Sequence, residues 1–246
     1  MKTALYDLSN RPASFDYVTF LSTAKAYGCD HVRLVLKNGW KKKNYTLEQA
    51  KERYASIVEP AAALFGMSYS VGDREGVEYS HFFDACMKAY RDTGKAWKII
   101  VPAEPKDYVT ITLRKSRTPE RDSNEEEWRK FARMVACKVI ILRDWDETPI
   151  DLHDRMRLYA GARMNFMVIN GPLTLCIHSD APYLSMRTIG CANSGSTSPA
   201  HMSRIGITPG FQFPWANANQ RLSYLDDTAE NVMLEWENML RERKAA

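Results

Sequence analysis

The chain has 246 residues, of which 45% are hydrophobic and 26% are charged, and its formal net charge is +4. This composition is that of a folded globular protein and excludes a disordered chain. The small net charge, with Lys41-Lys42-Lys43 as the one tight basic run, also argues against a protein that binds nucleic acid, which would carry a basic stripe.

The five cysteines are scattered along the chain and form no Cys-x-x-Cys pair. We therefore expect reduced thiols in a cytoplasmic protein. The sequence after Met1 has no apolar leader, and no stretch is long enough to cross a bilayer. Action on a membrane-linked substrate would require peripheral association with the membrane surface.

Strand and helix patterns alternate from the first residues, which predicts an α/β fold with largely parallel sheets. In the first half, strands are predicted at residues 4–8, 31–36, 67–71 and 97–101. Helices are predicted to begin at Ser14, Thr46 and Ser80, the last of them ending at Gly94. Pro102-Ala-Glu-Pro105 blocks both helix formation and strand pairing and predicts a linker.

After the linker the alternation restarts, with strands predicted at residues 108–114, 138–142, 165–169 and 183–187. Helices are predicted between them at residues 123–136, 152–162 and 173–178. Residues 190–212 are rich in Gly, Ser, Thr and Pro and predict a long surface loop or lid. Asp227 and Glu230 have the spacing of a capping box that opens a last helix. The predicted parts are therefore one α/β domain at residues 1–104, a second at 105–226 and a C-terminal helix at 227–246.

Basic residues crowd the end of the strand predicted at 108–114. They are Arg114, Lys115, Arg117 and Arg121. Ser123, three residues before Glu126, forms a capping box that predicts the start of the next helix. In open α/β sheets ligands bind at the carboxyl ends of the strands, where guanidinium groups can pair bidentately with a diphosphate. The alternative interpretation is a solvated basic loop balanced by the acidic run 125–127.

A second loop with anion-binding character follows the apolar run 164–169. It reads Asn170-Gly171-Pro172 and leads into the helix predicted to begin at Leu173. A Gly turn between a strand and a helix points backbone N–H groups and the positive end of the helix dipole at one spot, which suits a phosphate. Asn-Gly-Pro is also ordinary turn chemistry. The anion site is therefore predicted from the two loops together.

The sequence predicts no bound metal and no cofactor. The five histidines have no spacing that suits a metal site or a catalytic triad. Asp144 and Asp146 have the spacing of an Asp-x-Asp metal motif, but the intervening Trp145 is unusual in a coordination loop. Asp144 is better interpreted as hydrogen bonding a base or ribose, or as a helix cap.

From Tyr108 onward the chain resembles the nucleotide-sugar-binding half of glycosyltransferases with the GT-B architecture. The resemblance rests on the strand that ends in Arg114, the loop 121–124 before a Trp-containing helix, and Asp144 after a strand. Asn170-Gly171-Pro172 is similar to the Gly-Pro phosphate turn of heptosyltransferase-type enzymes. Residues 212–216, Gln220 and Asp226-Asp227 are similar to the tail of bacterial glycosyltransferase-like proteins. The motifs cover half of the chain, and the rest is matched by topology only.

The resemblance implies two compact Rossmann-like domains that face a cleft, and metal-independent transfer of a sugar from a nucleoside-diphosphate sugar to an acceptor hydroxyl. The acceptor would be a carbohydrate, a lipid-linked molecule or a protein. The residues implied to bind the diphosphate are Arg114, Arg117, Arg121, Ser123, Asn170, Gly171, Pro172 and Leu173. Those implied to bind the nucleoside or sugar are Asn124, Asp144 and Gln220.

An inverting transfer also needs a general base. Asp7, at the end of the first strand, is the best-placed carboxylate for this role, although Asp73, Glu75 and Glu78 are alternatives. Two other functions remain open. One is a nucleotide-sugar epimerase or hydrolase of the same architecture, and the other is a non-catalytic protein that binds a phosphorylated ligand.

Overall fold

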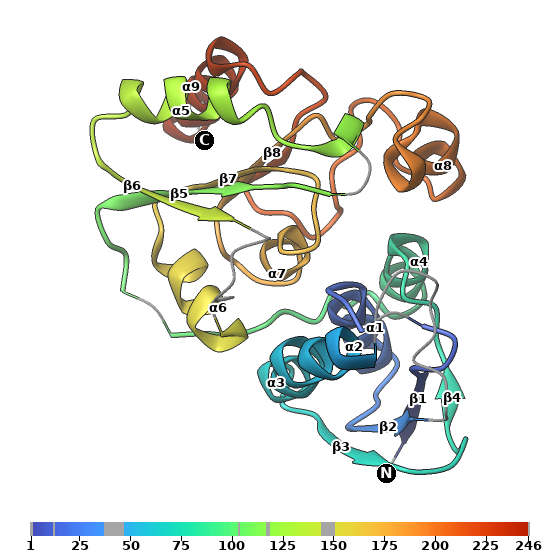
Figure 1. Ribbon diagram of the computed structural model, residues 1–246. Coiled ribbons are helices and arrows are strands. Elements are labelled where there is room, and N and C mark those ends of the chain that lie inside the picture. The colour runs from blue at the N-terminus through green and yellow to red at the C-terminus, as the bar shows by residue number, and fades with distance from the viewer. Residues whose placement is uncertain are drawn as a thin grey trace. The chain divides into compact units, whose positions relative to one another are not determined.

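A computed structural model describes residues 2–11, 13–36, 47–102, 104–116, 119–143 and 151–245. The chain forms two compact units, one of Met1–Val101 with Asp151–Met156 and one of Pro102–Ile150 with Arg157–Ala246. Each unit is built on a sheet whose strands all run parallel, which confirms the predicted α/β fold with two parallel sheets (Figure 1). Within the described ranges no helix is long and apolar enough to span a membrane.

The sheet of the first unit has the strand order β3-β2-β1-β4. Its strands are β1 (Thr3–Asp7), β2 (His31–Val35), β3 (Ser68–Val71) and β4 (Val77–Glu78). An aromatic cluster joins β1 to the helix α1 (Asp16–Ala26), because the ring of Tyr6 lies 4.7 Å from that of Tyr17 and 4.8 Å from that of Phe20. All three side chains are fully buried, so this face of the sheet carries the core of the unit.

The remaining helical segments of the first unit are α2 (Leu47–Arg53), a π-helical turn (Tyr54–Val58), α3 (Glu59–Leu64) and α4 (Phe83–Thr93). Pro60 lies in the first turn of α3, where the missing N–H of proline costs least. As predicted, α4 ends at Gly94, whose φ of +67° is the left-handed conformation that glycine adopts most readily.

One expectation for the first unit was wrong, and one of its strands was not anticipated. Residues 97–101 form no strand beyond a single bridge at Ile99, because this segment is partly solvent-exposed and Ile100 is 86% accessible. The strand β4, with only two residues, was too short to show an alternating pattern. Thr46, the predicted start of α2, lies outside the described residues.

The sheet of the second unit has the strand order β6-β5-β7-β8-β9. Its strands are β5 (Tyr108–Leu113), β6 (Lys138–Arg143), β7 (Asn165–Val168), β8 (Tyr183–Met186) and β9 (Gln220–Leu222). In Figure 1 the helices α5 (Glu125–Met134) and α9 (Ala229–Ala245) lie on one face of this sheet. The helix α7 (Leu173–Ile177) and the part of α6 (Leu152–Gly161) that belongs to this unit, from Arg157 onward, lie on the other face.

The two faces of the second sheet differ in chemistry. Toward α5 and α9 the strands present apolar residues, and the ring of Phe131 packs at 4.8 Å from that of Phe166. Burial of one such ring contributes about 1.5–3 kcal/mol. The opposite face carries buried polar side chains, where Thr110 Oγ1 donates to Asn165 Oδ1 at 2.6 Å. Thr112 Oγ1 likewise lies 2.8 Å from the hydroxyl of Tyr159 on α6.

Three details of the second unit differ from the predictions. The segment 190–212 is not all loop, since it contains a 3₁₀ turn (Gly195–Thr197) and the short helix α8 (Pro199–Arg204). The strand β9 was not anticipated because its three residues include Gln and Arg. The helix α9 begins at Ala229, where Thr228 Oγ1 accepts from the N–H of Asn231 at 3.3 Å, so Thr228 and not Asp227 makes the capping bond.

Candidate functional site

The strand order of the second unit has a topological switch point at β5. The first strand, β5, lies between β6 and β7, so the chain leaves β5 toward one side and later returns to its other side. Connections at such a switch point diverge to opposite faces of the sheet and leave room between them at the carboxyl ends of the strands. Ligands of such sheets bind at this position, so the candidate site, called the crevice below, is the region between the loop after β5 and the loop after β7.

Arg114 follows β5 and reaches across this crevice. Thr112 is paired with Met167, so residues two positions further along, Arg114 and Ile169, face each other beyond the strand ends. Arg114 Nη1 donates to the carbonyl oxygen of Ile169 at 3.0 Å. The structure thus places a guanidinium group directly beside the Asn170-Gly171-Pro172 turn.

The turn after β7 is closed by its own hydrogen bonds. Asn170 Oδ1 accepts from the N–H of Leu173 at 3.0 Å, and the N–H of Thr174 donates to the carbonyl of Gly171 at 3.0 Å. The N–H of Leu175 donates to Pro172 O at 3.1 Å. The first N–H groups of α7 are therefore engaged, contrary to the expectation that they would be offered to a phosphate. The helix also has only five residues, so its dipole is small.

One donor of this turn has no acceptor. The side chain of Asn170 is 7% exposed, and its Nδ2 is buried without a hydrogen-bond partner. The orientation of the amide is fixed, because only Oδ1 can accept from Leu173 N–H. A buried unsatisfied donor costs about 1–3 kcal/mol, and such groups in native proteins call for a functional or structural reason.

The loop after β5 is held to its own strand end. The N–H of Arg114 donates to Ser123 Oγ at 2.8 Å, and the N–H of Ser123 donates back to Arg114 O at 3.0 Å. The predicted capping box was wrong, because Asn124 Oδ1 accepts from the N–H of Glu127 at 3.5 Å and is the cap of α5. Ser123 is thus a structural clamp of the loop, and Arg121 lies half-buried in the 3₁₀ turn Pro119–Arg121 inside it.

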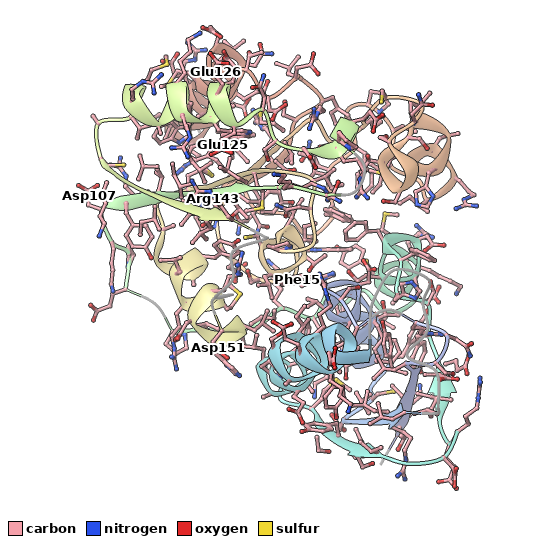
Figure 2. All side chains as sticks on the ribbon, in the orientation of Figure 1. Phe15, Asp107, Glu125, Glu126, Arg143 and Asp151 are labelled. Carbon is pink, nitrogen blue, oxygen red and sulfur yellow. The ribbon has the colours of Figure 1, made fainter. Side chains whose placement is uncertain are left out.

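Acidic residues at the start of α5 have partners on neighbouring elements. Glu125 Oε1 lies 2.6 Å from Arg129 Nη2 and 3.6 Å from Nη2 of Arg143, at the end of β6 (Figure 2). Glu127 pairs with Lys130 at 3.8 Å and accepts from the N–H of Ala229 at 2.8 Å. These carboxylates are engaged by α5, β6 and α9, whereas the solvated-loop interpretation assigned them to the basic loop.

Two predicted site residues cannot be placed, and a third is elsewhere. Arg117 and Asp144 lie outside the described residues. Gln220 is the first residue of β9 and pairs with Tyr183, the first residue of β8, so it lies at the amino edge of the sheet. The two N–H groups of its Nε2 are shared among three carbonyl oxygens within 3.0 Å, and its Oε1 accepts from Asn217 N–H. The amide of Gln220 therefore closes the chain around α7 and does not contribute to the crevice.

Asp7, the predicted base, lies in the first unit at the end of β1. Its side chain is 3% exposed. Its oxygens accept from Ser9 N–H and Oγ and from Asn10 Nδ2, and Nη1 of Arg74 lies at 2.7 Å. Burial raises the pKa of Asp7, but the hydrogen bonds of Ser9 and the charge of Arg74 outweigh it and hold the pKa below its usual value. A carboxylate with these partners is a weak base, and the geometry supports a structural role; the catalytic assignment stays a prediction.

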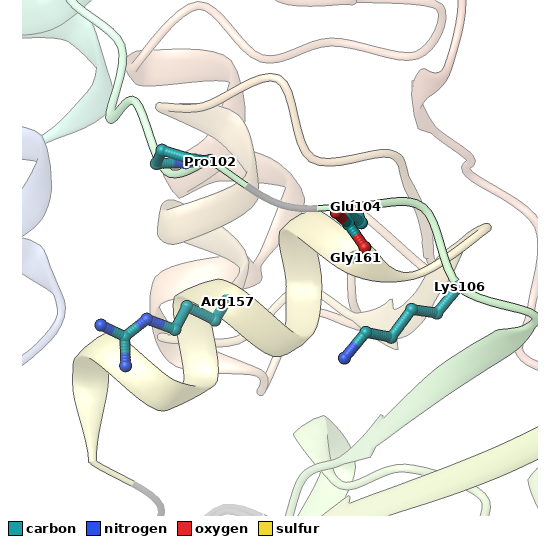
Figure 3. A pocket seen from close by; sticks show the side chains of 5 residues that line it. All are labelled: Pro102, Glu104, Lys106, Arg157 and Gly161. Atoms are coloured by element: carbon teal, nitrogen blue, oxygen red, sulfur yellow. The ribbon is translucent and has the colours of Figure 1, made fainter.

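A small pocket of about 230 Å³ lies in the second unit, away from the crevice. It is lined by Pro102, Glu104, Lys106, Arg157 and Gly161 (Figure 3). Lys106 and Pro102 precede β5, so this pocket lies near the amino edge of the sheet. In the part of the chain that the structure describes, no group of three His, Cys, Asp or Glu residues could hold a metal ion.

Sequence reasoning missed a buried ionic group behind the crevice. Asp227, only 4% exposed, accepts from Trp128 Nε1 and from the N–H of Asn124, both at 2.9 Å. Arg187, which follows β8, lies with its Nη1 3.6 Å from Asp227. The sequence signal was present as a carboxylate before α9, but the capping-box spacing led to a different role.

No protein-family model and no curated protein matches this chain. Solved structures that are similar to it include E. coli heptosyltransferase WaaC with ADP, at 13% identity over 97% of this chain and 100% of that chain, with a TM-score of 0.47. They also include the iron-containing dodecameric glycosyltransferase TibC from enterotoxigenic E. coli, at 11% identity and a TM-score of 0.48. That match covers 88% of this chain and 62% of TibC, so the chain spans less than two thirds of the length of TibC.

Heptosyltransferases, to which the Gly-Pro turn was compared, are thus among the structures that this chain resembles. At 11–13% identity and TM-scores below 0.5, the likeness assigns neither an activity nor a ligand to the chain.

Proposed function

We propose that the crevice of the second unit binds the diphosphate of a nucleoside-diphosphate sugar, and that the protein transfers the sugar to an acceptor hydroxyl. The observation that carries the proposal is the contact of Arg114 with the start of the Asn170 turn, at the switch point of the sheet. The guanidinium of Arg114 donates to the carbonyl oxygen of Ile169 at 3.0 Å. A guanidinium group is a planar donor suited to phosphate oxygens. Asn170 Nδ2 adds a buried donor that an anionic acceptor would satisfy.

In this proposal the chain stabilises the departing diphosphate with its own cations. Transfer of the sugar breaks the bond between the sugar and the diphosphate, and negative charge develops on the diphosphate oxygens. Arginine side chains fixed beside that charge lower the barrier without a divalent ion. Arg121 and Lys115 come from the same loop as Arg114 and add positive potential around it. Arg117, which lies outside the described residues, is proposed from the sequence to bind the same diphosphate. Asp144 is proposed to contact the nucleoside or sugar.

The state of Asp7 favours a second candidate, a non-catalytic protein that binds a phosphorylated ligand. The oxygens of Asp7 are occupied by Ser9, Asn10 and Arg74, so the first unit presents no ready base at the position where one was predicted. A transferase would then need its base from elsewhere, and a binding protein would need none.

The test is turnover of nucleotide sugars with EDTA present and absent. The protein is incubated with ADP-, UDP-, GDP- and CDP-linked sugars, with and without mixed carbohydrate and lipid-linked acceptors, and released nucleoside diphosphate is measured. We expect release that requires an acceptor and persists in EDTA. Release or isomerisation without acceptor would instead identify a hydrolase or epimerase, and tight binding without turnover would identify the binding protein. The absence of both binding and turnover with every donor would refute the proposal.

A further inference from the structure

Arg187 is the only non-glycine residue with a positive φ among those the structure describes, at +47°. It follows β8 directly, at the same edge of the sheet as the crevice. L-residues with a side chain adopt this conformation at a cost, so it persists only where surrounding contacts fix it. Here the N–H of Arg187 donates to Leu225 O at 2.9 Å, and the N–H of Thr188 donates to Ser223 O at 3.0 Å. The backbone is thus held on both sides of the strained residue.

The side chain of Arg187 joins two separate segments. Its Nη2 donates to the carbonyl oxygen of Asp122, in the loop between β5 and α5. Its Nη1 lies 3.6 Å from Asp227 Oδ1, just before α9. The side chain of Arg187 is 22% exposed and that of Asp227 is 4% exposed, so little water screens this pair.

Asp227 continues the connection back to the same loop. Its Oδ2 accepts from the N–H of Asn124 and from the indole of Trp128, a fully buried residue of α5. Removal of the positive charge of Arg187 would leave the buried carboxylate of Asp227 without its ionic partner. An unpaired buried charge strongly destabilises the structure around it. Arg187 and Asp227 therefore hold the loop at Asp122 and at Asn124, on either side of Ser123.

Those two attachment points determine where the loop lies. Ser123 is bonded twice to the backbone of Arg114, and Asp122 Oδ1 accepts from the N–H of Ser116 at 2.6 Å. The positions of Arg114 and Arg121 follow from these bonds, since both residues belong to the segment that they close. The strained backbone of Arg187 is thus linked, through these bonds, to the positions of Arg114 and Arg121.

We propose that Arg187 is the positioning residue of the basic loop, acting through Asp227 and the Asp122 carbonyl to hold Arg114 in the crevice. As a contribution to diphosphate binding, this role rests on the proposed function. Its role in holding the loop does not rest on the proposed function. Loop geometry and diphosphate binding can therefore be measured separately.

The test uses the substitution Arg187→Gly, because glycine accepts a φ of +47° without strain while removing the guanidinium. Arg187→Lys keeps a charge near Asp227 but lacks the planar fork that spans two acceptors. Arg163→Ala is the matched control, since Arg163 is in the same unit and forms an exposed pair with Asp107 at 2.9 Å.

Amide hydrogen exchange is measured first on the free proteins. In Arg187→Gly we expect the amides of Ser116, Ser123 and Asn124 to exchange about tenfold faster or more, as a charge-assisted hydrogen bond is lost. Exchange in β5 and α9 should stay unchanged, Arg187→Lys should recover part of the protection, and Arg163→Ala should match the wild type. Unchanged protection of residues 114–124 in Arg187→Gly would overturn the proposal, as would an equal loss across the whole unit.

Each protein is then titrated with inorganic pyrophosphate by calorimetry. We expect about tenfold weaker binding for Arg187→Gly, with Arg187→Lys intermediate. Full affinity in Arg187→Gly despite a loosened loop would overturn its role in binding. Failure of the wild type to bind pyrophosphate would count against the proposed function, while the exchange result would still decide whether Arg187 positions the loop.

Discussion

The buried histidine of α7 makes the stability of the protein depend on pH in a way that one substitution should remove. His178 is fully buried at the end of α7, and its ring stacks on that of Trp215 with centroids 6.0 Å apart. Burial lowers its pKa from 6.5 to about 3. The folded protein therefore keeps His178 neutral at pH values where the unfolded chain takes up a proton.

The sign and size follow from this difference. Between pH 6.5 and about 3 the unfolded state binds more protons at this residue than the folded state, so the free energy of unfolding falls as the pH falls. The slope approaches about 1.4 kcal/mol per pH unit, which amounts to about 2–3 kcal/mol between pH 6.5 and 4.5. His178→Gln is neutral throughout and should lack this contribution.

The assay is urea unfolding followed by circular dichroism at pH 4.5 to 7, at constant ionic strength. The stability difference between wild type and His178→Gln should shift by about 2–3 kcal/mol in favour of the variant as the pH falls through this range. Contributions from carboxylates cancel in the difference. Gly66→Ala, which changes no titratable group, is the control, and its stability difference from the wild type should not change with pH. A difference for His178→Gln that does not change with pH would refute the reasoning.

Two further predictions concern the first unit, and both are checked by urea midpoints. The pKa of Asp7 is lowered in the folded state, so its stabilisation is present above about pH 4 and is lost as the pH falls below that value. Asp7→Asn should cost about 1.5–3 kcal/mol at pH 7, and the deficit should shrink in acid; a deficit that is constant to pH 2.5 would contradict this. Gly76 has a φ of +128°, and an added Cβ would lie 2.8 Å from Thr3 O, so Gly76→Ala should cost about 1–3 kcal/mol. Gly66→Ala, with a φ of +58° and open space, should cost only about 1 kcal/mol, and equal losses at both positions would show that the contact with Thr3 is unimportant.

The pattern of apolar residues was sufficient to locate four strands of the second unit but not β9, which has few apolar residues. The strands at residues 108–113, 138–143, 165–168 and 183–186 have largely apolar residues, all of them buried except in the strand at 138–143, and were predicted within one or two positions. The strand β9 contains Gln220 and Arg221, whose polarity hides the pattern. Residues 97–101 show the opposite failure, because an apolar run that stays partly exposed looks like a strand.

The same limit applies to the candidate site. The sequence predicted that the basic loop and the Asn170 turn would be neighbours, and the structure places Arg114 against Ile169 because β5 and β7 are adjacent. Bonds between distant residues left no local signal. Trp128 and Asp227 are 99 positions apart, so the role of Asp227 could not be separated from a helix cap by spacing alone. The assignment of Gln220 to the nucleoside or sugar was made for a related reason, since the sequence does not show that its amide bonds to the backbone around α7.

The most direct test of the central claim is calorimetric titration of the wild type and of Asn170→Asp with nucleoside diphosphates. Asn170→Asp retains the acceptor for Leu173 N–H but replaces the unpaired donor with a negative charge, in the turn that follows the Ile169 carbonyl bound by Arg114. We predict that the wild type binds at least one nucleoside diphosphate and that Asn170→Asp and Arg114→Met each bind it at least about tenfold more weakly, while Arg163→Ala is unaffected. Equal affinity in the wild type and both crevice variants, or no binding by the wild type, would contradict a diphosphate site between β5 and β7.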